Sequence, residues 1–136
     1  MGLPAHLIPV LVCLLACSSN FIHGRNFNIP LQETIKTLNI LMGKDPPCME
    51  LPIADVLAAP KNMTEKETFC RVAVVLRQVY MHHNCEETNR SLRKLDRNLN
   101  GMANKITCSV NEVRMSTLRD FLERLRRMMQ QKYARG

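Results

Sequence analysis

The chain has 136 residues, with 19 Lys or Arg, 12 Asp or Glu and no Trp. This length fits one domain, and the 46% share of apolar residues excludes an intrinsically disordered chain. Five Gly and seven Pro without any period exclude collagen-like and low-complexity proteins.

The N-terminal segment is predicted to be a targeting signal rather than part of the fold. An unbroken apolar run extends from Leu7 to Cys17, and polar residues 18–20 follow it. The run is shorter than the roughly 20 residues of a transmembrane helix and has the length typical of a signal peptide. Cleavage after Gly24, with cleavage nearer Ala16 or Ser18 as the alternative, would leave a single domain, residues 25–136, that is secreted, extracellular and not inserted in a membrane.

Four later segments place apolar residues at the three- and four-residue spacing of an amphipathic helix. These segments are residues 30–42, 65–83, 86–101 and 118–135. Thr64 with Glu67, and Thr117 with Asp120, have the spacing of N-terminal caps before the second and fourth segments. The domain is therefore predicted to be all-α.

The connections between these helices differ in length. Only a few residues separate the second helix from the third, so we expect these two to be antiparallel neighbours. The other two connections are long, and alternating apolar residues within 49–53 and 106–110 predict a short strand in each. Two long crossovers predict an up-up-down-down four-helix bundle with a small two-stranded ribbon.

Four cysteines remain after the signal, and in an oxidising compartment they predict two disulfides. Cys70 and Cys85 would lie about 22 Å apart along one helix, whereas a disulfide spans at most about 7 Å between Cα atoms. Two pairings stay open. They are Cys48–Cys85 with Cys70–Cys108, and Cys48–Cys70 with Cys85–Cys108.

Two sequons predict N-glycosylation of Asn62 and Asn89, and we expect both segments on the surface. The run from His82 to Cys85 has no second ligand cluster, so neither a metal ion nor another cofactor is expected. No Gly-x-Ser-x-Gly motif and no carboxylate pair with a positioned His is present, so no enzyme is predicted.

Positive charge is concentrated in the second half of the domain. Residues 25–89 contain 7 basic and 8 acidic residues, whereas residues 90–136 contain 12 and 4. The face of helix 86–101 opposite its apolar stripe consists of Arg90, Arg93, Lys94 and Arg97. Such a field attracts an acidic protein surface, and it also suits a glycosaminoglycan. The run Arg124-x-Arg126-Arg127 suits such a polyanion too, so a heparin-binding or host-defence helical protein is the alternative function.

Several long runs together carry a family resemblance: residues 31–39, 61–71, 75–78, 95–99, 116–118 and 121–125. In these runs, and over nearly the whole chain, the sequence resembles the interleukin-4 family of short-chain four-helix cytokines. The resemblance implies a monomeric growth factor that acts on B and T lymphocytes, without a nucleic-acid partner. It also implies the pairing Cys48–Cys85 with Cys70–Cys108. The family commonly joins its chain ends by a third disulfide, but Phe27 and Gly136 stand at those places here.

The same resemblance implies two receptor contacts on opposite flanks of helix 30–42. The flank shared with helix 86–101 would bind the interleukin-4 receptor alpha chain through Glu33 and Arg97. The surrounding contacts would be Ile29, Thr37, Arg77, Arg93, Lys94 and Asn98. The flank shared with helix 118–135 would bind either the common gamma chain or the interleukin-13 receptor alpha chain. Its contacts would be Ile35, Asn39, Tyr133 and Gln130, the last of which stands where the family often has a basic residue.

Overall fold

The structure is a computed structural model that describes residues 28–58, 63–112 and 114–135. This part of the chain contains the helices α2 (Asn28–Lys44), α3 (Glu65–His82), α4 (Glu86–Met102) and α5 (Leu118–Arg135), with the strands β1 (Pro52–Ala54) and β2 (Met115–Thr117). The expected signal peptide 1–24, the sequon residue Asn62, and the positions Phe27 and Gly136 lie outside the described residues. The four helices match the predicted segments to within two residues at each end.

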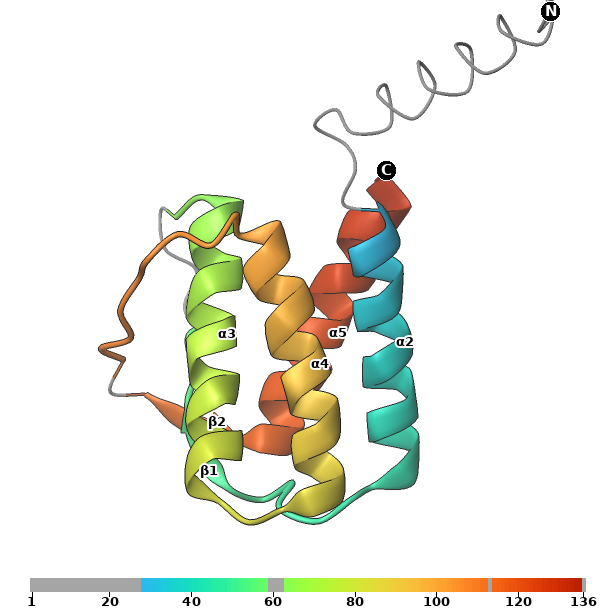
Figure 1. Cartoon of the computed structure of the whole chain (residues 1–136), viewed down its shortest axis with the longest axis vertical. Coiled ribbons are helices and arrows are strands. Elements are labelled where there is room, and N and C mark those ends of the chain that lie inside the picture. Colours follow the sequence, from blue (N-terminus) through green and yellow to red (C-terminus); the bar gives the residue numbers. More distant parts are fainter. Residues whose placement is uncertain (1–27, 59–62, 113, 136) are drawn as a thin grey trace, which may run out of the picture.

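The bundle has the predicted up-up-down-down order (Figure 1). α2 and α3 run in one direction, and α4 and α5 run in the other. α2 packs against both α4 and α5, and α3 packs against α4, its antiparallel neighbour. The start of α2 and the end of α5 therefore lie at the same end of the molecule, while the ribbon of β1 and β2 lies near the opposite end.

Each helix contributes one apolar stripe to a common core, as the residue spacing predicts. Burying one such side chain contributes roughly 1.5–3 kcal/mol, so the stripe of each helix decides which of its faces turns inward. The fully buried members include Leu38, Phe69, Leu76, Leu92, Leu95, Leu99, Phe121, Leu122 and Leu125. The polar flanks on either side of each stripe remain at the surface.

Side-chain caps start α3 and α5 where the sequence places them. Thr64 Oγ1 accepts a hydrogen bond from the backbone N–H of Glu67 at 3.1 Å. Thr117 Oγ1 accepts one from the N–H of Asp120 at the same distance of 3.1 Å. Because the first N–H groups of a helix lack intrahelical partners, each cap typically contributes about 1 kcal/mol.

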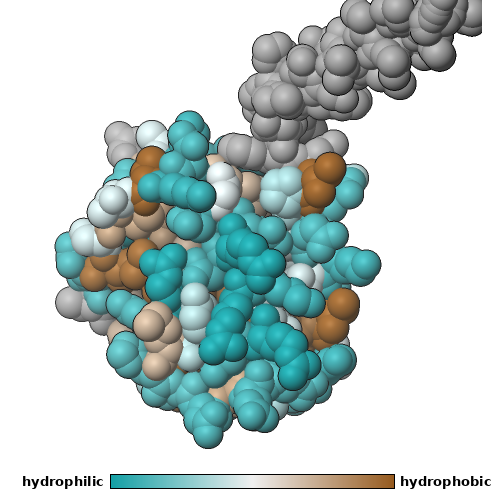
Figure 2. All heavy atoms as spheres, viewed as in Figure 1, coloured by the Kyte–Doolittle hydropathy of each residue, from teal (hydrophilic) through white to brown (hydrophobic). Residues whose placement is uncertain are grey.

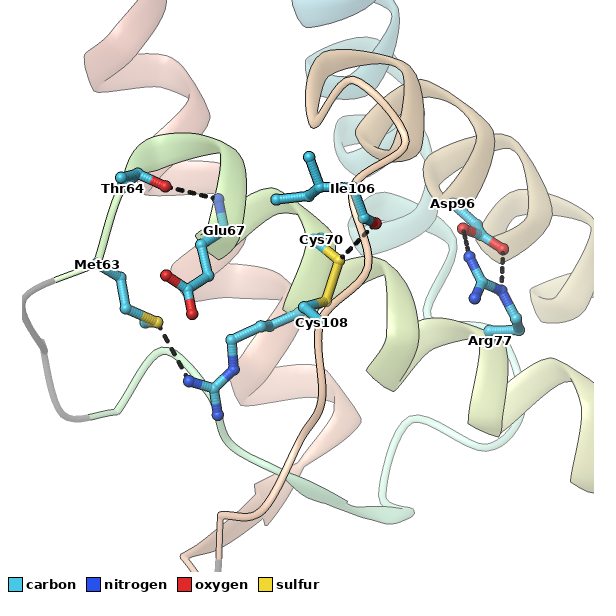
Figure 3. The surroundings of a disulfide bond; sticks show 9 residues. Met63, Thr64, Glu67, Cys70, Arg77, Asp96, Ile106 and Cys108 are labelled. Carbon is cyan, nitrogen blue, oxygen red and sulfur yellow. Dashed lines mark hydrogen bonds and ion pairs between the residues drawn. A yellow bond between two sulfur atoms is a disulfide. The ribbon is translucent and has the colours of Figure 1, made fainter.

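The two disulfides tie both crossovers to the helices. Cys48–Cys85 joins the first crossover to the turn between α3 and α4, and Cys70–Cys108 joins the second crossover to α3 (Figure 3). The Cα atoms lie 6.2 Å apart in both bonds, which close 37 and 38 residues. Each closure contributes roughly 4 kcal/mol if it acts by restricting the unfolded chain. This is the pairing that the family resemblance implies.

The ribbon exists, but the predicted position of its second strand is wrong. β1 pairs antiparallel with β2, and Ile53 lies opposite Ser116, so residues 106–110 form no strand. The Cys108 disulfide holds residues 106–110 along α3 instead. The start of α5 reaches the first crossover, where the N–H of Leu118 donates to the Leu51 carbonyl oxygen at 2.8 Å.

Asn89 contradicts the expectation of an exposed sequon. Its side chain is only 6% exposed, and its Nδ2 donates to the carbonyl oxygens of His83, at 2.8 Å, and Tyr80, at 3.5 Å. Carbonyls at a helix C-terminus lack intrahelical partners, so this amide provides a hydrogen-bond donor to the carbonyls at the end of α3. A glycan would attach to the same nitrogen. In the folded chain this nitrogen is therefore already hydrogen-bonded, and N-glycosylation of Asn89 stays a prediction.

Two variants separate a structural Asn89 from a glycosylated one. Asn89→Ala should lower the free energy of unfolding by about 1–3 kcal/mol, because it leaves buried carbonyl oxygens without a donor. Ser91→Ala removes the sequon but keeps the amide, so it should leave stability unchanged. Denaturant unfolding and the intact mass of both secreted variants measure these effects. A loss of glycan mass in Ser91→Ala would contradict the structural role.

Candidate functional site

The exposed flanks of α2 and α4 lie side by side, as the first proposed contact requires. Glu33 of α2 and Lys94 and Arg97 of α4 are exposed, and Thr37 is half-buried. Thr37 and Lys94 line one groove of about 260 Å³ between the two helices. Neither Glu33 nor Arg97 forms an ion pair with another described residue, so both charges are available to a partner.

The basic stripe of α4 is exposed along its length, as predicted. Figure 2 shows hydrophilic side chains gathered over this helix, at the centre of the view. All of its predicted members are exposed: Arg90, Arg93, Lys94 and Arg97. Ile29, at 72% exposure, lies at the start of α2, and Asn98 is half-buried on α4. The structure thus brings the residues named for the first contact onto α2, α4 and the neighbouring part of α3.

A buried carboxylate lies between the basic stripe and the leucine stripe of α4. Asp96 is only 7% exposed, and it accepts hydrogen bonds from Arg77 Nε at 3.1 Å and Arg77 Nη2 at 2.9 Å (Figure 3). The Tyr80 hydroxyl also donates to Asp96, and the Arg93 guanidinium lies 5.2 Å from the centre of the Tyr80 ring. We call these four residues the Asp96 cluster. Its members come from α3 and α4, so it joins two neighbouring helices.

The electrostatics of the Asp96 cluster change the chemistry of two of its members. Burial, and then the hydrogen bond and negative charge of Asp96, raise the pKa of the Tyr80 phenol. The hydrogen bond with Asp96 raises the pKa of the Arg77 guanidinium, although burial acts in the opposite direction. Tyr80 therefore remains a neutral hydrogen-bond donor, and Arg77 is already bound to a carboxylate.

The other flank of α2 meets α5. Gln32 Nε2 donates to the Tyr133 hydroxyl at 2.7 Å, and Arg126 Nη1 donates to Asn39 Oδ1 at 3.2 Å. Tyr133 is 43% exposed and Asn39 is exposed, so both remain accessible from solvent. The structure thus brings Asn39 and Tyr133 to one α2/α5 face.

The remaining members of the second contact differ in exposure. Gln130 is exposed on α5, whereas Ile35 is half-buried and packs against the core. The sequence interpretation placed neither Gln32 nor Arg126 in a site, yet these two side chains connect the helices of this face. It also left out Tyr80 and Asp96. The paired three-residue spacings of Arg77 with Tyr80 and of Arg93 with Asp96 are the only sequence signal for that cluster, since three residues is close to one helical turn.

The described residues include no group of three or more His, Cys, Asp and Glu arranged to hold a metal ion. Within residues 28–58, 63–112 and 114–135, no helix has the length and apolar character needed to cross a membrane.

Known proteins are similar to this chain over almost its full length. A sequence model of the family described as Interleukin 4 matches residues 26–134. Interleukin-4 of Felis catus is 61% identical over 135 residues, that of Sus scrofa is 60% identical over 135, and that of Bos taurus is 59% identical over 137. Each of these alignments covers 99% of both chains.

The raised pKa of Tyr80 predicts how the fold responds to alkaline pH. Because the folded phenol keeps a proton that the unfolded phenol loses, this contribution to stability is fully present below about pH 10 and falls as the pH rises further. A Tyr133→Phe variant leaves Tyr80 as the only tyrosine. Its tyrosinate absorbance should appear at a higher pH than that of a solvent-exposed tyrosine. Adding Asp96→Asn should shift that titration to lower pH. An identical titration with and without Asp96 would contradict the coupling.

Proposed function

The chain belongs to the interleukin-4 family, and we propose that it is a secreted, monomeric cytokine that joins two receptor chains. The α2/α4 face would bind the interleukin-4 receptor alpha chain first. The α2/α5 face would then recruit either the common gamma chain or the interleukin-13 receptor alpha chain, so that kinases on both cytoplasmic tails become active in B and T lymphocytes. One observation carries the proposal: α2 has two exposed polar flanks, each beside a different helix.

Unpaired opposite charges support the first contact. Glu33 and Arg97 face solvent on neighbouring helices, and a receptor surface that offered a donor to one and a carboxylate to the other would satisfy both. Charge-assisted hydrogen bonds of this kind are about twice as strong as neutral ones. The excess of basic residues after position 90 would also steer an acidic receptor surface and raise the association rate.

The hydrogen bonds between α2 and α5 support the second contact. Tyr133 and Asn39 already have neighbours on the facing helix, so little side-chain freedom remains to be lost on binding. Such a prepared surface is suited to a partner that arrives after the first complex has formed. Gln130 brings no charge to this face, and Arg126 is already paired with Glu123, so recognition there would rest mainly on hydrogen bonds and the Tyr133 ring.

The pairing of cations on α5 argues against a primarily heparin-binding or host-defence function. Arg124 binds the buried Asp55 carboxylate at 2.7 Å. Arg126 and Arg127 contact Glu123 at 2.9 and 3.4 Å. These are the three arginines that motivate that alternative, and each already has an acidic partner. Glycosaminoglycan binding by the α4 stripe stays compatible with a cytokine.

Charge reversal at one face should separate the two contacts. Arg97→Glu should weaken alpha-chain binding by about 2–5 kcal/mol, or a factor of roughly 30 to several thousand, because an acid would then face an acidic receptor surface. Lys66→Glu, an equal charge change on an exposed residue of α3 outside both faces, is the matched control. Binding to immobilised alpha-chain ectodomain measures both. A heparin-like interaction would instead give a modest loss that disappears at high salt and is similar for the two variants.

Tyr133→Asp should leave alpha-chain binding nearly intact and block signalling, because its carboxylate would meet only the second receptor chain. Such a variant would act as an antagonist that occupies the alpha chain. Receptor phosphorylation in responsive lymphocytes, measured beside alpha-chain binding, tests this expectation. If Tyr133→Asp and Arg97→Glu lost alpha-chain binding in parallel while circular dichroism showed intact helices, the assignment of two faces would be wrong.

A further inference from the structure

We propose that Asp96 is a positioning residue for the alpha-chain contact, holding Tyr80 so that its ring presents the Arg93 guanidinium to the receptor. This inference rests on the proposed function of the α2/α4 face. It assigns roles to Asp96 and Tyr80, which neither the sequence pattern nor the resemblance named.

The burial of the Asp96 carboxylate has a free-energy cost that its partners must offset. Its carboxylate is almost fully buried within a helix whose exposed residues are mostly cationic, and burying an ion is unfavourable unless it is paired and hydrogen-bonded. Two N–H groups of Arg77 and the Tyr80 hydroxyl provide that pairing. The acid is thereby hidden from the surface, where it would repel an acidic receptor.

The same hydrogen bonds alter the role implied for Arg77. Its Nε and Nη2 are committed to Asp96, and its side chain is 39% exposed. The positive charge is therefore largely compensated within the chain, and only the remaining N–H groups can reach a receptor. Arg77 is better described as part of the support than as a free cation of the contact surface.

Tyr80 links this support to the contact surface. Its hydroxyl is fixed by Asp96, and its ring is half-buried at the junction of α3 and α4. Arg93 lies one helical turn before Asp96 on α4, and its guanidinium is within cation–π distance of the ring, at 5.2 Å from the centroid. A free arginine would lose rotamer freedom on binding, whereas a stacked one has already lost part of it. The benefit should therefore appear mainly as slower dissociation of the receptor.

A merely structural role for the cluster predicts something different. If Asp96 only held α3 against α4, its loss would weaken receptor binding equally whether or not Arg93 is present. If it positions Arg93, its loss matters only while Arg93 is there. A double-mutant cycle in receptor dissociation distinguishes the two, because it measures the coupling between residues rather than the fold.

The test uses Asp96→Asn, Tyr80→Phe and Arg93→Ala, with each of the first two also combined with Arg93→Ala. Dissociation from the immobilised alpha-chain ectodomain is measured for all of them. Asp96→Asn should dissociate about 3–10-fold faster than the unmodified chain but less than about 2-fold faster in the Arg93→Ala background. Tyr80→Phe keeps the ring and loses only the hydroxyl, so it should show the same pattern with a smaller effect. Asp120→Asn, the same change at an exposed residue of α5, is the control and should have no effect.

Equal losses with and without Arg93 would overturn the positioning role. If Asp96→Asn fails to fold by circular dichroism, Tyr80→Phe decides the question, because it removes one hydrogen bond without leaving an unpaired charge. Failure of the unmodified chain to bind the ectodomain would overturn the proposed function and this inference with it. Binding without coupling would overturn the inference alone.

Discussion

The burial of one leucine stripe on α4 is the constraint on which the candidate site depends. Leu92, Leu95 and Leu99 are fully buried, and α4 packs against both α2 and α3. With its apolar side fixed inward, α4 must turn its arginines and lysine outward, next to the flank of α2 that carries Glu33. The same rotation leaves Asp96 at the edge of the stripe, within reach of α3. The exposed basic stripe of α4 and the buried position of Asp96 therefore both follow from the packing of this leucine stripe.

The two crossovers determine how α5 is placed, and thus the second face. Helices that run in the same direction need long connections, and long connections need tethers to hold a single path. The two disulfides, the short ribbon and the Arg124–Asp55 pair serve this purpose at several points. They place α5 beside α2, so one helix contributes a flank to each of two surfaces. A small chain thereby has two separate polar faces without a second domain.

The sequence predicts the parts of the structure that depend on local spacing and misses those that depend on contacts between elements. Helix positions and the exposed stripe of α4 follow from periodicity, and the caps at Thr64 and Thr117 follow from residue types at a fixed spacing. The second strand is predicted at residues 106–110 instead of 115–117 because both segments are short and their residue pattern does not distinguish them. The Cys70–Cys108 disulfide holds residues 106–110 along α3, so residues 115–117 pair with β1 instead. The burial of Asn89 cannot be predicted from its sequon, because a sequon is a three-residue pattern and the burial of this amide depends on the end of another helix. The Asp96 cluster is likewise invisible until α3 and α4 are side by side.

Sequential capture tests the central claim, that one helix serves two separate faces, most directly. The chain is first saturated with the alpha-chain ectodomain, and the second-chain ectodomain is then added while the mass of the complex is followed by light scattering. Two independent faces predict a complex with one copy of each component, in which the second ectodomain binds the preformed pair at least as tightly as it binds the chain alone. Displacement of the alpha chain by the second ectodomain would contradict two separate faces.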